Sequence, residues 1–135
     1  MPQSLPEVFV HRALTAHLYA RGYQVREELR FGSARFDTIA FTDGKVLGYE
    51  VKLTSWTRAL RQVQVYKLCC DEVYLVIPSK SLSEAIVARC QDEGVGLVTI
   101  GVPPDWKFTA VLPAPPSTIR NQLHHANIQR IAAFE

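Results

Sequence analysis

The stretch RFDTIAFTDGKVLGYEVKL, from Arg35 to Leu53, decides the fold. Two apolar runs flank Asp43 and Gly44, and an Asp-Gly pair in this setting is a strong signal for a two-residue hairpin turn. The runs RFDTIAF and KVLGYEVKL are therefore predicted to form antiparallel strands. A turn centred on this pair also fixes the register, because it sets Phe41 opposite Val46 and thereby determines all the other residue pairs of the hairpin.

This register places Asp37 opposite Glu50, with Lys52 two residues further along the same face. Charged groups inside apolar strands weaken a core unless they serve a purpose. Two neighbouring carboxylates raise each other's pKa unless a cation lies between them, and Mg²⁺ prefers a few carboxylate oxygens together with waters and phosphate. The three side chains therefore predict a metal-assisted phosphodiester site, and Gly48 is expected to leave the backbone open beside it.

The flanking sequence predicts a regular order of helices and strands. A first helix is expected from the capping box of Ser4 and Glu7 to Gly22, and a further capping box is formed by Ser81 and Glu84. The order implies an α/β (α+β) fold, a mixed central sheet with helices on both faces. The other expected helices are 57–70, 81–94 and 117–134, the last with Ser117 as its cap, and the other expected strands are 23–31, 72–78, 96–101 and 107–112.

Composition is that of an ordinary globular domain, with 47% hydrophobic and 21% charged residues in 135. We expect a single domain over 1–135, with a core at 4–101 and a C-terminal strand and helix extension at 102–135. No stretch approaches the roughly 20 apolar residues of a membrane helix, and no secretory signal is recognisable. A cytoplasmic protein without a membrane partner is therefore expected. The three cysteines, an odd number without CxxC spacing, are interpreted as buried thiols.

Asp37 followed by Glu50-Val51-Lys52 resembles the D…(D/E)-x-K signature of the PD-(D/E)xK nuclease superfamily, whose members are restriction-endonuclease-like. The predicted order also resembles the αβββαβ core of that superfamily, over about Ser4 to Ile77, although Phe36 stands where the nominal motif has proline. The small size is similar to that of Holliday junction resolvases, whereas Gln62 and Tyr66 resemble the Q-x-x-x-Y motif of RecB-type nucleases.

The resemblance implies a Mg²⁺- or Mn²⁺-dependent deoxyribonuclease acting in DNA repair, recombination or defence, with endonuclease action favoured over exonuclease action. It implies that Asp37, Glu50 and the backbone carbonyl of Val51 bind the metal, and that Lys52 positions the attacking water. Glu7 would add a metal contact, unless it serves only as a helix cap.

Gln62 and Tyr66 would orient the scissile phosphate, or would merely cover the sheet. Gln64 competes with Gln62 for the first of these places, because the sequence defines helix boundaries only to within several residues.

A DNA-binding surface would have to come from local arginines, because the net charge is only +2. Arg58, Arg61 and Lys67 form a phosphate-contacting stripe or a solvated face, and Arg35 would extend the stripe from the hairpin. A homodimer is a further expectation, and RNA stays open as a substrate. His124 and His125 are interpreted as surface residues. The rival function is a non-catalytic nucleic-acid-binding or assembly module that retains the nuclease fold.

Overall fold

The computed structural model describes residues 7–31, 34–54, 56–119 and 122–133. The predicted cap at Ser4 and the predicted end of the last helix at Phe134 lie outside the described residues.

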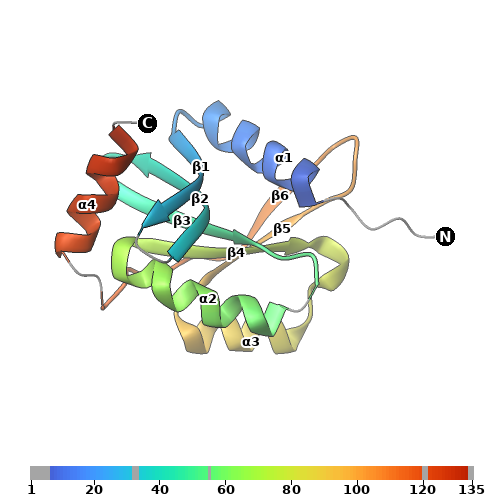
Figure 1. Cartoon of the computed structure of the whole chain (residues 1–135). Coiled ribbons are helices and arrows are strands. Elements are labelled where there is room, and N and C mark those ends of the chain that lie inside the picture. Colours follow the sequence, from blue (N-terminus) through green and yellow to red (C-terminus); the bar gives the residue numbers. More distant parts are fainter. Residues whose placement is uncertain (1–6, 32–33, 55, 120–121, 134–135) are drawn as a thin grey trace.

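Six strands form one mixed sheet in the order β1-β2-β3-β4-β5-β6 (Figure 1). The first three are an antiparallel meander, β3, β4 and β5 run parallel, and β6 returns antiparallel to β5. The predicted mixed sheet is therefore confirmed. The strands are β1 Gln24–Phe31, β2 Ala34–Thr42, β3 Lys45–Val51, β4 Glu72–Pro78, β5 Gly96–Ile100 and β6 Phe108–Leu112.

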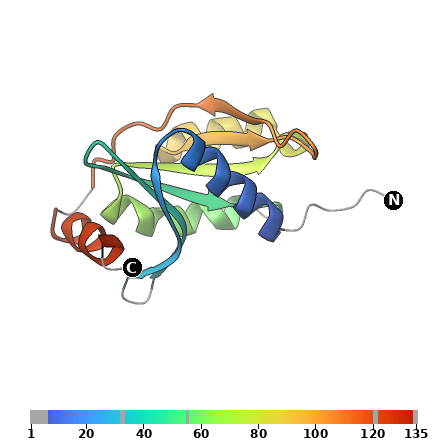
Figure 2. The same cartoon turned by 90° about the horizontal axis from the view of Figure 1, so that it is seen from above.

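Helices cover both faces of the sheet, as predicted. Helix α1 (Glu7–Ala20) lies on one face, and α2 (Trp56–Cys69), α3 (Glu84–Glu93) and α4 (Gln122–Ala133) pack on the other side (Figures 1 and 2). Each face has its own buried apolar cluster. Val10, Leu14 and Leu18 of α1 belong to one cluster, whereas the helix residues of the other come from α2, α3 and α4.

The hairpin between β2 and β3 has the predicted register. Ile39 pairs with Gly48 and Phe41 pairs with Val46. Asp43 and Gly44 both take positive φ, at 48° and 76°, which is the backbone conformation of a tight hairpin turn with right-handed strand twist. The turn therefore sets which face of the sheet each side chain of both strands meets.

The start of α3 corrects one predicted cap. Ser81 belongs to a short 3₁₀ turn, and the Ser83 hydroxyl accepts the capping hydrogen bond from the backbone N–H of Ile86 at 3.3 Å. The helix begins at Glu84, and an N-cap must directly precede the first helical residue. The predicted stop is confirmed, because Gly94 ends the helix in the left-handed conformation.

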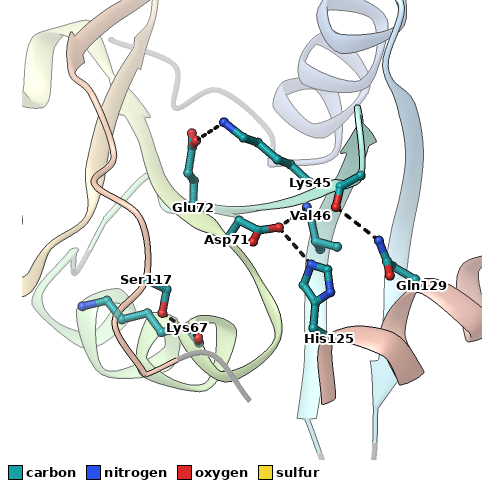
Figure 3. Close-up of polar contacts among 9 residues, drawn as sticks. Lys45, Val46, Lys67, Asp71, Glu72, Ser117, His125 and Gln129 are labelled. Carbon is teal, nitrogen blue, oxygen red and sulfur yellow. Dashed lines mark hydrogen bonds and ion pairs between the residues drawn. The ribbon is translucent and has the colours of Figure 1, made fainter. Parts of the chain in front are cut away.

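The start of α4 corrects a second cap, because the helix begins at Gln122 rather than after Ser117. The Ser117 hydroxyl donates instead to the backbone carbonyl of Lys67 at 2.8 Å (Figure 3). The backbone N–H of Ser117 donates to the backbone carbonyl of Asp71. The segment before α4 is thus fixed to the end of α2, so that Ser117 cannot cap a helix.

His125 is buried, which makes its prediction as a surface residue wrong. Its Nε2 lies 2.9 Å from Oδ2 of Asp71, and the same oxygen accepts from the N–H of Val46 at 2.7 Å (Figure 3). Asp71 therefore joins α4 to the first residues of β3.

All three cysteines are free and buried, as predicted, and burial raises the pKa of each thiol. They are structural apolar residues rather than nucleophiles. Within the part of the chain that the structure describes, no helix is long and apolar enough to cross a membrane.

Gly48 marks a close approach of α2 to the sheet. A Cβ at this position would lie 2.6 Å from Cδ2 of Tyr66 and 3.0 Å from Sγ of Cys70. The prediction that Gly48 leaves its backbone open to a ligand is therefore wrong, because the ring of Tyr66 fills that space.

Substitution Gly48→Ala is expected to destabilise the protein by about 1–3 kcal/mol, because an added methyl group overpacks a filled site. Urea unfolding measures the loss. Gly101→Ala is the matched control, because its Cβ would meet ordinary contacts at 3.5 Å or more. Equal free energies of unfolding for the two variants would contradict the close packing of Tyr66 on Gly48.

Candidate active site

One cleft of about 470 Å³ collects most of the predicted site residues. It lies where the first residue of α1, the beginning of β2, the end of β3 and one side of α2 approach one another. Phe36 and Val65 supply apolar walls. The predicted residues that line it are Glu7, Arg35, Asp37, Glu50, Lys52, Gln62 and Tyr66.

The hydroxyl of Tyr66 connects the two central acidic residues. It donates to Oε1 of Glu50 at 2.6 Å and accepts from the backbone N–H of Asp37 at 2.7 Å. The ring is only 2% exposed and packs edge-on against Phe36. Burial, with the nearby carboxylates of Glu50 and Asp37, raises the pKa of Tyr66, so the hydroxyl stays protonated. Tyr66 therefore positions the acids, and its hydroxyl is already engaged within the protein.

A local break in strand β1 leaves the N–H of Asp37 available to Tyr66. The ladder of β1 and β2 pairs Glu27 with Thr38 and then Leu29 with Phe36, and it skips Glu28, whose φ is +53°. Positive φ is uncommon for a residue with a side chain, and such distortions gather at functional sites. The distortion thus lies opposite Asp37, at the edge of the cleft.

Glu50 is the most perturbed acid of the cleft. Its residue exposure is 5%, and the pKa of Glu50 is raised to about 8, from an ordinary value of 4.5, with burial as the largest cause. The neighbouring carboxyl of Asp37 contributes to this rise, whereas the Tyr66 hydroxyl and the Lys52 ammonium oppose it. Without a cation, Glu50 therefore holds a proton at neutral pH. A divalent cation between the two carboxyl groups would take the place of that proton.

His11 joins the site, although sequence reasoning missed it. Ligand atoms of Glu7, His11 and Asp37 all lie within 4.8 Å of one another. The signal was present, because Glu7 and His11 are four residues apart on a predicted helix and so share one face. Nε2 of His11 lies 3.9 Å from Oε1 of Glu7.

Two carboxylates and an imidazole suit a divalent metal ion, and Asp37 belongs both to this group and to the acid pair with Glu50. Glu7, His11 and Asp37 could therefore hold one divalent ion, and Asp37 with Glu50 could hold another.

On α2, Gln62 rather than Gln64 is the glutamine at the cleft. Gln62 is exposed and lines the cleft, whereas the amide of Gln64 donates to Oε2 of Glu93 at 2.8 Å. Lys67 donates to the backbone carbonyl of the same Glu93 and is not among the described residues that line the cleft, so its phosphate contact stays a prediction. The ammonium group stabilises the C-terminal end of α3.

The remaining predicted residues lie at the rim or behind the site. Arg35 lines the cleft and forms an exposed ion pair with Glu28 at 3.2 Å. Arg58 and Arg61 are exposed on α2, outside the set of described residues that line the cleft. The side chain of Val51 packs in the α1-side cluster, and the metal role of its carbonyl stays a prediction.

No family model matches the chain, and no curated protein matches it. Among solved structures it is similar to SPO1766, a protein of unknown function from Silicibacter pomeroyi, with 19% identity and a TM-score of 0.71 over 93% of this chain and 82% of the other. It is also similar to AF1548, a protein of unknown function, with 17% identity and a TM-score of 0.52 over 67% and 57%. These similarities establish a shared fold and no activity.

A more distant likeness is to SfsA of Pyrococcus furiosus in complex with Ca²⁺, with 13% identity and a TM-score of 0.38 over 78% and 59%. It supports no inference about this chain.

In the absence of metal, the free energy of unfolding is expected to fall as the pH rises from about 4.5 to about 8. The pKa of Glu50 is higher in the folded protein than its ordinary value, so the folded state holds an extra proton in this window and its advantage is lost as that proton leaves. Urea unfolding in EDTA across this range measures the slope.

Glu50→Gln should flatten that slope, because the amide keeps the shape of the side chain and does not titrate. Asp92→Asn, at an exposed carboxylate of α3, is the matched control and should leave the slope unchanged. Parallel curves for wild type and Glu50→Gln would show that Glu50 does not carry the extra proton.

Proposed function

We propose that this protein is a nuclease of the PD-(D/E)xK type, which hydrolyses phosphodiester bonds of DNA with Mg²⁺ or Mn²⁺. The observation that carries the proposal is the convergence of Asp37, Glu50 and Lys52 in one cleft, where the Tyr66 hydroxyl bonds the Glu50 carboxyl and the backbone N–H of Asp37. A buried acid beside a second carboxyl group costs stability when nothing neutralises the pair, so its presence in a cleft favours a functional explanation.

The donor set supports a role for a divalent cation. Asp37 and Glu50 would hold one ion, and Glu7 and His11 would complete a second position with Asp37. Bound Mg²⁺ or Mn²⁺ would stabilise negative charge on the phosphate and make a water molecule more acidic. Glu50 must release its proton before it can serve as a ligand, so metal binding should strengthen as the pH rises toward about 8.

The other side chains of the cleft would act on the substrate. Lys52 would donate to a non-bridging phosphate oxygen, where charge grows as the water oxygen attacks phosphorus. The bond from phosphorus to the 3′ oxygen then breaks, and the products are a 5′-phosphate and a 3′-hydroxyl. Gln62, exposed at the rim, would hold the phosphate through its amide. Tyr66 is assigned a positioning role, because its hydroxyl already bonds the Glu50 carboxyl and the backbone N–H of Asp37.

Exposed arginines at the cleft and on α2 favour a nucleic acid over a small phosphodiester. Arg35 lines the cleft, and Arg58 and Arg61 lie on the exposed surface of α2. Guanidinium groups on such surfaces contact successive phosphates of a strand. We infer DNA as the substrate and endonuclease action, in repair, recombination or defence.

Cleavage of a labelled DNA panel tests the proposal, with linear duplex, closed circle, single strand, flap and four-way junction each incubated with Mg²⁺ or Mn²⁺. We expect metal-dependent cutting that falls by about 100-fold or more in Lys52→Ala and Asp37→Asn, because each removes charge stabilisation at the reacting phosphate. Arg89→Ala is the control, since Arg89 is an exposed residue of α3 away from the cleft.

Cutting of the closed circle would establish endonuclease action. If no DNA is cut while all variants bind DNA equally, the nuclease proposal fails, and the rival binding or assembly module takes its place.

The imidazole of His11 predicts a metal preference that carboxylates alone would not give. Imidazole binds Mn²⁺ and later transition ions better than it binds Mg²⁺, so His11→Gln should reduce the rise in melting temperature caused by Mn²⁺ more than the rise caused by Mg²⁺. His17→Gln, also on α1 but outside the acidic cleft, is the control. Identical Mn²⁺-dependent shifts in the two variants would remove His11 from the metal site.

A further inference from the structure

A second cleft, of about 450 Å³, lies on the opposite side of the sheet and shares no lining residue with the acidic cleft. It lies between the C-terminal half of α1, the hairpin turn of β2 and β3, and the α1-side face of strands β3 to β6. Its volume falls in the range of clefts that hold small molecules.

Aromatic rings dominate the interior of this second cleft. Tyr49 and Tyr74 stack on each other with centroids 5.1 Å apart, and His17 stacks on Phe108 at 4.6 Å. Burial lowers the pKa of His17, with a further contribution from Arg21, so the imidazole is neutral near pH 7 and behaves as another flat ring. Such walls suit a planar aromatic ligand.

The Tyr49 hydroxyl lies in this setting without a hydrogen-bond partner among the described residues. The residue is 7% exposed and lines the cleft, and burial raises the pKa of its hydroxyl, which therefore stays a donor. Its neighbour Tyr74, by contrast, donates to Oε1 of Glu72 at 2.6 Å. Tyr49 lines the cleft, so its hydroxyl is available to a polar atom of a ligand.

Two charged groups of opposite sign, those of Arg21 and Asp43, also line the cleft. The guanidinium of Arg21 lies 5.5 Å from the centroid of the Tyr23 ring and makes no hydrogen bond or ion pair with any described side chain. The carboxylate of Asp43 is likewise without a partner in the described part of the chain. Lys45, in contrast, is paired with Glu72 at 3.5 Å (Figure 3).

We propose that this second cleft binds a nucleoside monophosphate. The base would lie among the aromatic rings and accept a hydrogen bond from Tyr49, and the phosphate would meet the guanidinium of Arg21. Asp43 would accept from sugar hydroxyls or from an exocyclic amino group. A nucleotide offers a flat base to the aromatic rings and Tyr49, a phosphate to Arg21, and hydroxyl or amino donors to Asp43. The nucleotide is either free or a unit of a strand, and the inference does not depend on the proposed nuclease activity.

Isothermal titration calorimetry in EDTA, with AMP, GMP, CMP and dTMP in turn, tests the proposal on the whole chain. We expect at least one nucleotide to bind with a dissociation constant on the order of 1 mM or tighter. The corresponding nucleoside should bind about tenfold more weakly, because it lacks the charge-assisted contact to Arg21, and ribose 5-phosphate should give no measurable heat.

Two substitutions separate the contacts. Arg21→Gln should weaken nucleotide binding about tenfold and leave nucleoside binding unchanged, whereas Tyr49→Phe should weaken both severalfold while keeping the ring. Lys52→Ala and Arg89→Gln are controls in the acidic cleft and on α3, and both should bind the nucleotide like wild type. Circular dichroism and thermal melts establish that each variant is folded.

Absence of binding by all four nucleotides at about 5 mM would overturn the proposal. So would binding that is lost in Lys52→Ala but kept in Arg21→Gln, because the ligand would then lie in the acidic cleft. A 5′-phosphorylated trinucleotide that displaces the mononucleotide assigns the cleft to a strand, and one that fails to displace it assigns the cleft to free nucleotides. Loss of DNA cleavage in Lys52→Ala leaves this binding test unaffected.

Discussion

The hydrogen bonds of the Tyr66 hydroxyl are the constraint on which the site depends. One group donates to the Glu50 carboxyl and accepts from the Asp37 backbone, so β2, β3 and α2 meet at a single oxygen. This position is available only because Gly48 has no side chain beneath the ring. The N–H of Asp37 reaches the hydroxyl where β1 departs from regular pairing at Glu28. The packing of Tyr66 on Gly48, the irregular pairing of β1 and the placement of the two acids therefore depend on one another.

The same arrangement explains why an acid with so high a pKa is kept in the protein. Glu50 is buried beside Asp37, and burial alone makes its ionised form unfavourable. An apolar residue at this position would cost the folded state less. Proteins commonly give up stability in this way where a site needs pre-organised charge. On this account the acids are held close together so that a divalent cation replaces the proton, and Lys52 then faces a substrate phosphate rather than Glu50 alone.

The parts of the fold that local chemistry dictates were predictable from sequence. The Asp43-Gly44 turn sets the hairpin register, which predicts that Asp37 and Glu50 lie close together. The paired ladder ends one step earlier, at Thr38 and Tyr49, and the two acids line one cleft. The buried run at β4 and the stop at Gly94 followed from equally local signals. Those signals decide backbone conformation within a few residues, and no long-range contact overrides them here.

The features that sequence reasoning missed depend on residues distant in the chain. His125 reads as a surface residue until Asp71, more than fifty positions earlier, is placed beside it. Lys67 fits a basic stripe in the sequence, but in the structure its ammonium group donates to the backbone carbonyl of Glu93 at the end of α3. The sequence alone does not show which of Gln62 and Gln64 lies at the cleft, because the choice depends on the hydrogen bond from Gln64 to Glu93. The positive φ of Glu28 is not predictable from its residue type, because that conformation favours glycine rather than glutamate.

A ¹³C NMR titration of the Glu50 side-chain carboxyl, with and without Mg²⁺, tests the central claim most directly. The account predicts a pKa of about 8 in EDTA, and a marked decrease when Mg²⁺ is added, because the cation takes the place of the proton. An Asp37→Asn variant should show a smaller elevation in EDTA and a weaker response to Mg²⁺. A Glu50 carboxyl that titrates near its ordinary value of 4.5, with no response to Mg²⁺, would contradict both the burial of Glu50 beside Asp37 and its role in metal binding.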